Sequence, residues 1–319
     1  MPRDLDRRSF LRGAAAAAAL PVVGGRALAS GQEPAPPPAA LENPMPGSAG
    51  IRSGGFRKAL KIGMVGDGET LLEKFALVKE LGFDGIEMDS PNGYDAAEVV
   101  AARDATGLVV HGCVDSVHWG KPFSHPDAAV RAEGVAALRT ALADAQAYGA
   151  STVLVVPAVV SKGVSYGDAW ERSHAEIAKV LPEARERGIH IAFENVWNNF
   201  LLSPIEAAHW IDSFESPMVG MYFDVGNVVR YGWPEHWIDV LAHRILKVDV
   251  KEYSRKKQMD EGPWKGFGVE LHDGDCDWPT VVAALRRTGY EGWFTLEVGG
   301  GGRERLATLA AHVDRIFAS

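Results

Sequence analysis

Cysteine is scarce in this sequence, and long apolar stretches are missing. Only Cys113 and Cys276 occur among 319 residues, so at most one internal disulfide can form and the fold cannot depend on a disulfide framework. The main apolar run near the N-terminus is shorter than the roughly 20 residues that cross a bilayer. We therefore expect no membrane span in the mature protein. The composition, with 46% hydrophobic and 24% charged residues, is typical of a globular protein with a substantial core.

The first 29 residues have the organisation of an export signal. Arg7 and Arg8 form a twin arginine ahead of the apolar stretch 14–23, and residues 27–29 match an A-x-A cleavage pattern. An amphipathic helix is the alternative, but the apolar stretch has no polar face. We predict a Tat-type signal peptide over residues 1–29, export to the periplasm or another extracytoplasmic compartment, and no stable membrane anchor after cleavage.

Positive charge is in short supply as well. The chain has 33 Lys and Arg against 42 Asp and Glu, a formal charge of −9, and loss of the predicted signal removes five Arg and two Asp, which takes the charge to about −12. A surface this acidic argues against a nucleic-acid partner.

The rest of the chain predicts a linker followed by one α/β domain. Residues 30–56 are rich in Pro, Gly and Ala without an apolar period, which predicts a flexible linker. From residue 57 to 319, short apolar runs alternate with segments of helical spacing. The expected strands are KIGMV (61–65), GIEM (85–88), LVVHG (108–112), TVLVV (152–156), IHIAFE (189–194), VGMYFD (219–224), ILKVDVK (245–251) and WFTLE (293–297).

Several expected helices end in a glycine directly before the next strand, which is typical of a left-handed helix cap. These glycines are Gly82, Gly107, Gly149, Gly188 and Gly289. Eight strand-helix units in about 260 residues predict a closed (β/α)₈ TIM barrel. The alternative is an open doubly wound sheet, which carries a glycine-rich turn after its first strand; residues 66–69 match that turn only in part.

Four consecutive predicted strands carry an acid at or near their C-terminal ends: Glu194, Asp224, Asp249 and Glu297. In a TIM barrel these ends open onto the catalytic mouth. Carboxylates crowded together with little water repel one another, so they need protons, cationic side chains or a metal. An all-oxygen ligand set favours a hard divalent ion, with Mn²⁺ first and Mg²⁺ or Co²⁺ as alternatives. The alternative for each acid singly is a helix cap or a loop position.

Other candidate substrate-binding residues lie near the remaining strand ends: Glu87, His111, His118, Trp119, Trp197, Asn227 and Lys251. A His-Trp pair beside a mouth suits a sugar, which it can stack on and hydrogen-bond. Lys251 is able to polarise a substrate oxygen or to pair with an acid. The glycine run 299–303 is either a phosphate seat, as in many barrels, or a turn that lets the backbone pass, and we favour the turn.

Several stretches resemble the sugar phosphate isomerase/epimerase family, which has a xylose isomerase-like TIM barrel and includes ketose 3-epimerases and inosose dehydratases. They are FENVWNNFLLSP (193–204), YFDVGNVVRYGWPEHWI (222–238), KVDVKEYSRKK (247–257), GDCDWP (274–279) and LEV (296–298), and the resemblance covers residues 57–319. In the epimerases Glu, Asp, His and Glu from strands five to eight hold Mn²⁺ or a similar ion. Asp249 departs from this pattern because it stands where the family commonly has histidine, and Asn227 stands where some epimerases have one.

The resemblance implies a metal-dependent isomerase that epimerises a small keto-sugar through an enediolate. Glu194 and Glu297 would act as base and acid on opposite faces of the substrate. Two alternatives remain: a lyase or dehydratase acting on a keto-sugar, keto-glycoside or inosose, and a non-catalytic periplasmic sugar-binding barrel. A homo-oligomer is an open alternative to a monomer.

Overall fold

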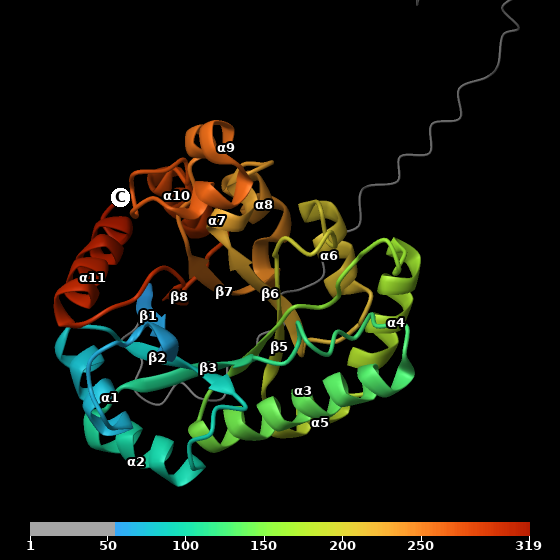
Figure 1. Ribbon diagram of the computed structural model, residues 1–319, viewed down its shortest axis with the longest axis horizontal. Helices are drawn as coiled ribbons and strands as arrows, with labels where there is room; N and C mark the ends of the chain where they lie inside the picture. Colours follow the sequence, from blue (N-terminus) through green and yellow to red (C-terminus); the bar gives the residue numbers. More distant parts are fainter. Residues whose placement is uncertain (1–54) are drawn as a thin grey trace, which may run out of the picture. The chain divides into compact units, whose positions relative to one another are not determined.

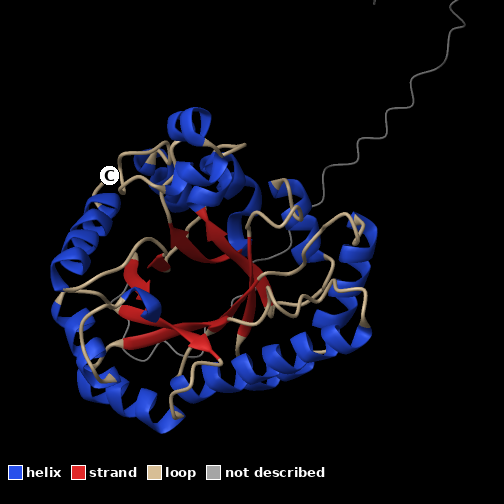
Figure 2. Ribbon diagram, viewed as in Figure 1, coloured by secondary structure: helices blue, strands red, loops and turns tan. Residues whose placement is uncertain are grey.

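Eight parallel strands close into a barrel in chain order, as predicted, and helices surround it (Figures 1 and 2). The computed structural model describes residues 55–319, so the predicted signal peptide and nearly all of the linker lie outside the described residues. The strands are β1 (Arg57–Lys61), β2 (Gly85–Ser90), β3 (Val109–Asp115), β4 (Thr152–Val155), β5 (His190–Glu194), β6 (Val219–Asp224), β7 (Ile245–Val250) and β8 (Trp293–Leu296).

The helices follow the strands in the expected alternation. They are α1 (Leu71–Glu80), α2 (Ala96–Thr106), α3 (Ala128–Tyr148), α4 (Tyr166–Ala178), α5 (Leu181–Arg187), α6 (Pro204–Asp212), α7 (Val225–Val229), α8 (Pro234–Leu241), α9 (Arg255–Glu261), α10 (Trp278–Arg287) and α11 (Arg303–Phe317). Three short 3₁₀ helices are η1 (Ile62–Met64), η2 (Ala242–Arg244) and η3 (Pro263–Phe267). Within residues 55–319, no helix combines the length and apolar character that a membrane crossing requires.

The first strand lies four residues earlier than its prediction at 61–65. Arg57 and Lys58 begin this strand, and two charged residues are not expected in a buried strand. Partners distant in the sequence accommodate both charges. Arg57 lies over the Trp293 ring, 4.4 Å from its centroid, and Lys58 Nζ is 2.6 Å from the Asp314 carboxylate. The apolar residues after Lys61 form η1 instead of a strand.

The five glycines predicted to stop helices all have positive φ, between 64° and 83°. This left-handed conformation carries little cost for glycine, and it turns the chain from each helix into the next strand. The long helix region near residues 168–187 divides into α4 and α5, because Pro182 occupies the first turn of a new helix.

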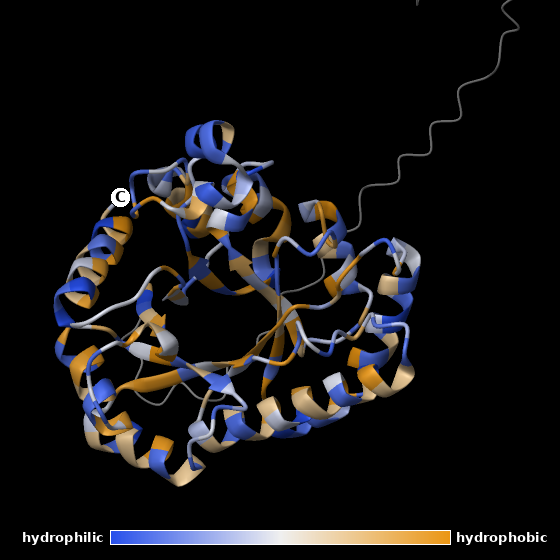
Figure 3. Ribbon diagram, viewed as in Figure 1, coloured by the Kyte–Doolittle hydropathy of each residue, from blue (hydrophilic) through white to orange (hydrophobic). Residues whose placement is uncertain are grey.

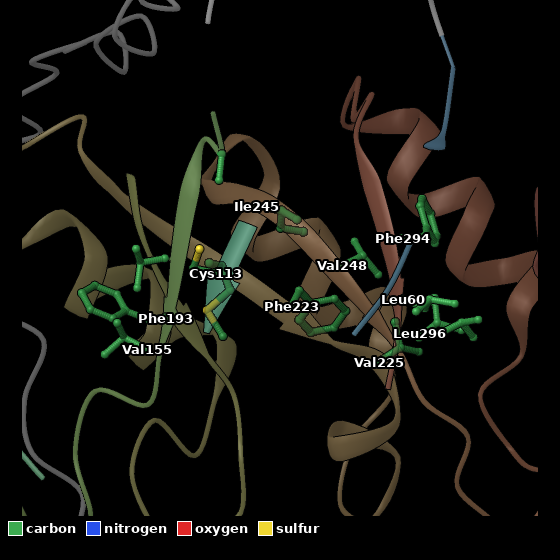
Figure 4. Close-up of a cluster of buried hydrophobic side chains, with 14 of the residues drawn as sticks. Leu60, Cys113, Val155, Phe193, Phe223, Val225, Ile245, Val248, Phe294 and Leu296 are labelled. Atoms are coloured by element: carbon green, nitrogen blue, oxygen red, sulfur yellow. The ribbon is translucent and has the colours of Figure 1, made fainter. Parts of the chain in front are cut away.

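Alternate residues of the strands point to opposite faces, and this alternation gives the barrel its two environments. Phe193, Phe223, Val248 and Phe294 are fully buried in the apolar core (Figure 4). Figure 3 shows that the surrounding helices have hydrophobic and hydrophilic faces. The neighbours of these core residues along each strand therefore face the barrel interior, and Glu194, Asp224 and Asp249 are among them.

Candidate active site

The four predicted acids converge at the mouth of the barrel. One carboxylate oxygen each from Glu194, Asp224, Asp249 and Glu297 lies within 4.8 Å of the others. Glu194 and Asp224 end β5 and β6, Asp249 lies in β7, and Glu297 directly follows β8, where its N–H donates to the Val250 carbonyl at 3.1 Å. The three strand residues are buried, and the Glu297 side chain is one-third exposed. We call these four residues the acid ring.

Two lysines compensate part of this negative charge. Lys251 Nζ lies 2.9 Å from Asp224 Oδ2 and 3.1 Å from Glu297 Oε2. Lys61 Nζ lies 3.1 Å from the same Glu297 oxygen and 3.3 Å from Asp249 Oδ2. Lys251 was predicted at the site, whereas Lys61 was missed. Its position as the last residue of β1 is the signal that would have found it.

The remaining imbalance suits a hard divalent cation. With all four carboxylates ionised, as ligands of a cation are, and two ammonium groups, two negative charges are left, which one divalent ion neutralises. Asp249 Oδ1 is buried with no hydrogen-bond donor among residues 55–319, and such an orphan costs free energy unless a ligand satisfies it. Oxygens on opposite sides of an ion with bonds of about 2.1 Å are separated by about 4.2 Å, which is compatible with the observed clustering. The acid ring therefore fits an oxygen-ligated divalent cation.

The two glutamates of the ring have opposite pKa shifts. Burial, reinforced by the negative charge of Glu297, raises the pKa of Glu194 to about 8. Burial also acts to raise the pKa of Glu297, but the nearby Lys61 and Lys251 outweigh it and lower the value to about 2. The site thus holds one protonated and one ionised glutamate near neutral pH, the pairing that acid-base chemistry needs.

Asp224 is both a helix cap and a member of the acid ring. Its Oδ1 accepts from the Asn227 N–H at 2.7 Å and caps α7, while its Oδ2 faces Lys251. The Asn227 side chain donates to the Asn195 carbonyl at 3.0 Å and reaches Glu194 Oε1 at 3.4 Å. Asn227 therefore links the ends of β5 and β6 beneath the mouth.

A second set of interior residues lies two positions earlier on the same strands: Ala192, Tyr222, Lys247 and Thr295. We call these four residues the support ring. The Tyr222 hydroxyl donates to Glu87 Oε1 at 2.9 Å and lies 2.7 Å from Thr295 Oγ1. Lys247 Nζ lies 2.9 Å from His111 Nδ1, and burial lowers the pKa of this lysine to about 7.

Glu87 and His111 were predicted to contact substrate, but the structure places both of them within this lower network. Strand β3 continues past His111 to Asp115, so the imidazole lies inside the barrel and stacks on Trp293 at 4.5 Å between centroids. Glu87 is almost fully buried, with Oε2 3.9 Å from Lys61 Nζ. Neither residue lines the cavity at the mouth.

The cavity above the acid ring has a volume of about 740 Å³. Six predicted residues line it: the substrate-binding candidates Trp119, Trp197, Asn227 and Lys251, and the catalytic candidates Glu194 and Glu297. Trp264 and Phe267 also line it and were missed. They lie in η3, within the long connection after β7, where no strand end marks them in the sequence.

His118 is buried near the mouth, in a fixed tautomer. Its Nδ1 accepts from the Val156 N–H at 3.3 Å, so the neutral ring carries its proton on Nε2. Burial, with a smaller contribution from Lys61, lowers its pKa to about 4. Asp115, which the sequence analysis missed, is buried nearby in the chain at the end of β3, and burial raises its pKa to about 7.

Comparison with known proteins places the chain in a family. The xylose isomerase-like TIM barrel family model matches residues 75–316, and the chain belongs to this family. A twin-arginine translocation signal model matches residues 4–24, which confirms the Tat-type signal; the cleavage position stays a prediction.

The similar proteins are mostly sugar epimerases. L-ribulose-5-phosphate 3-epimerase UlaE of Salmonella paratyphi C is 26% identical over 264 residues, covering 78% of this chain and 87% of that protein. Among solved structures, 3-keto-D-glucoside 4-epimerase YcjR of E. coli has a TM-score of 0.69 at 16% identity, covering 83% of this chain and all of that one. A D-tagatose 3-epimerase-like protein has a TM-score of 0.68 at 16% identity, with 82% and 97% covered. The structural likenesses establish the fold.

Proposed function

We propose that the protein is a divalent-metal-dependent epimerase that acts on a keto-sugar outside the cytoplasm. The observation that carries this proposal is the convergence of four carboxylates and two lysines at one point of the barrel mouth. Membership in the family and the epimerase activity named for the similar proteins support the reaction class. The Tat signal supports an extracytoplasmic, periplasmic location.

Glu194, Asp224, Asp249 and Glu297 would hold the cation, with Mn²⁺ the first expectation and Mg²⁺ or Co²⁺ as alternatives. When bound, it supplies Lewis-acid polarisation of the substrate carbonyl. Lys61 and Lys251 hold Glu297 ionised and keep it in place through contacts of 3.1 Å.

Glu194 and Glu297 approach the substrate from β5 and β8, on different sides of the mouth. The carboxylate of one takes the proton from the carbon next to the carbonyl as the C–H bond breaks, and the electron pair moves into the carbonyl to give an enediolate. The carboxylic acid of the other returns a proton to the opposite face. One proton is taken and one is returned, so the product is an epimer of unchanged mass.

Solvent exchange tests this proposal directly. Keto-sugars incubated in deuterated water with Mn²⁺ should give an epimer that carries deuterium next to the carbonyl, as read by mass spectrometry. Epimer without solvent deuterium would exclude proton transfer through exchangeable carboxyls. Ligand-induced stabilisation with no exchange at all would instead identify a sugar-binding barrel without catalysis.

Elimination is a second candidate. Asp249 in place of the histidine expected from the epimerases is the observation that favours a departure from plain epimerisation. The same proton abstraction, followed by loss of a β-substituent with the electron pair of its bond, gives a lyase or dehydratase reaction. A product lighter than the substrate would identify it.

A further inference from the structure

We propose that the outer part of the cavity is a subsite for a second ring, so that the substrate is an uncharged keto-glycoside instead of a sugar phosphate. We call Trp264 and Phe267, with Trp197 behind them, the aromatic shelf. This inference rests on the proposed function, because the reacting ring must lie at the acid ring. It selects one of the substrate classes that the sequence left open, and it adds Trp264 and Phe267, which the sequence did not predict, to the substrate-binding residues.

The cavity is larger than one sugar ring requires. Its volume of about 740 Å³ falls well inside the range of roughly 300–1,000 Å³ that holds drug-sized ligands. The proposed reaction site is part of this cavity, because Glu194, Glu297 and Lys251 line it. A monosaccharide bound at that site leaves the remainder to solvent.

The aromatic shelf lies next to Lys251, which contacts the acid ring. Lys251 Nζ lies 5.6 Å from the Phe267 ring centroid, and the Trp264 centroid lies a further 6.4 Å from that of Phe267. Exposure increases along the same path, from 18% for the Lys251 side chain to 70% for Trp264. Trp264 is therefore an exposed part of the cavity lining, whereas Lys251 is a much less exposed one.

The shelf is held in place from behind. The Trp197 ring lies 4.7 Å from that of Trp264 and 4.8 Å from that of Phe267, and its Nε1 donates to the Asn227 carbonyl at 2.9 Å. The Arg230 guanidinium lies over Trp197 at 4.5 Å. A fixed, exposed indole beside a polar centre offers its face to the C–H groups of a sugar or to an aromatic aglycone.

The turn after β8 and the N-terminus of α11, where many barrels bind phosphate, do not form an open phosphate site in this chain. The N-terminus of α11 is a possible anion site, but the Arg303 N–H there already donates to Asp67 Oδ2 at 2.7 Å. The preceding glycines are used for close packing. Gly301 exchanges backbone hydrogen bonds with Gly66 and Met64 at 2.9 and 3.0 Å, and a side chain on Gly300 would collide with the Met64 carbonyl. The glycine run is thus a packed turn, as we favoured.

The charges around the cavity also disfavour an anion. Its lining contains four carboxylate residues and only two cationic ones: Glu194, Glu252, Glu270, Glu297, Lys251 and Arg305. Both cations are paired, since Arg305 Nη1 lies 2.6 Å from Glu270 Oε2 and Lys251 contacts the acid ring. With a cation in the acid ring, the other charged lining residues are Glu252, Glu270 and Arg305, so this lining offers no unpaired cation to a phosphate ester.

The experiment compares four probes in deuterated water with Mn²⁺: 3-ketoglucose, its methyl glycoside, its phenyl glycoside and ribulose 5-phosphate. The wild-type protein should exchange hydrogen on the phenyl glycoside with kcat/KM about tenfold above the free sugar, and it should leave the phosphate ester unchanged. Trp264→Ala should remove that advantage and keep the rate on the free sugar. Trp233→Ala is the matched control, because Trp233 is also exposed but does not line the cavity.

Equal rates on all neutral probes, or a Trp264→Ala variant that acts like wild type, would overturn the subsite. Preferred turnover of ribulose 5-phosphate would overturn the uncharged substrate. Altered sedimentation of Trp264→Ala with unchanged kinetics would assign Trp264 to a contact between copies of the chain. Exchange on no probe would count against the proposed function instead. In that case calorimetric binding of the phenyl glycoside, tighter to wild type than to Trp264→Ala, still supports the shelf, and equal or absent binding refutes it.

Discussion

The acid ring and the support ring lie on the same four strands, two residues apart, yet their chemistry differs. Polar groups of the support ring are joined by hydrogen bonds, with Tyr222 between Glu87 and Thr295. In the acid ring, Glu194 and Glu297 line the cavity, and the four carboxylates outnumber the two lysines that contact them. A hydrogen-bonded network stabilises a fold, whereas a cluster of uncompensated charge marks a place for a ligand. Substitutions in the acid ring should therefore lower mainly activity, whereas substitutions in the support ring should lower mainly stability.

Replacement of Glu297 by Gln should give the largest effect. The variant keeps the size of the side chain but loses the proton-transfer group, so kcat should fall about 10³-fold or more, equivalent to about 4 kcal/mol. The fold should stay intact, although loss of the charge that pairs with Lys61 and Lys251 should lower the melting temperature. Deuterium exchange and thermal unfolding measure the two effects, and full activity would move the acid-base role to another residue.

Asp115 shows how an acid behaves without a lysine beside it. Burial raises the pKa of Asp115 from 3.8 to about 7, so the folded protein holds this proton more tightly than the unfolded chain. Stability should therefore fall as pH rises from about 4 to about 7, by up to about 4 kcal/mol. Asp115→Asn should flatten that part of the curve. Urea unfolding of both proteins at pH 4.5 and pH 8 measures the difference, and parallel curves would contradict the assignment.

Lys61 connects the rings, because it touches Glu297 and Asp249 above and lies 3.9 Å from Glu87 below. Lys61→Met leaves those carboxylates short of a cation and should lower the free energy of unfolding by about 3 kcal/mol in the absence of metal. Added Mn²⁺ should restore part of the loss.

The control is Lys256→Met, since the ion pair of Lys256 with Asp260 is exposed and should contribute little. A loss for Lys61→Met no larger than for this control would show that the acid ring does not depend on Lys61.

Tyr222→Phe tests the support ring. It leaves Glu87 Oε1 without this donor in a buried place, which should cost about 2 kcal/mol of stability. Activity per folded molecule should stay within a fewfold of wild type. Tyr94→Phe, at an exposed position, is the control. A large loss of turnover at unchanged stability would mean that the lower ring takes part in the chemistry.

The sequence predicts the barrel and the acid ring well because both depend on regular patterns. Alternation along each strand, and the common edge at which parallel strands end, bring Glu194, Asp224, Asp249 and Glu297 together without further information. The placement of His111 depended on where β3 ends. The prediction stopped at residue 112, and the strand continues to Asp115, so the imidazole lies lower than expected.

Residues whose role depends on tertiary contact were missed. Lys61 ends a strand whose charged start is compensated by partners distant in the sequence, such as Asp314 and Trp293. Trp264 lies in a connection of irregular structure, where periodicity says nothing about the direction of a side chain. Only the packing of Trp264 against Trp197 shows that its ring borders the cavity.

Titration of metal-free protein with Mn²⁺, followed by calorimetry and elemental analysis, tests the central claim most directly. The acid ring predicts one ion per chain, and Asp224→Asn should bind it at least tenfold more weakly because one charged ligand is lost. Binding of no ion by the wild-type protein, or equal binding by Asp224→Asn, would contradict a metal held by these four side chains.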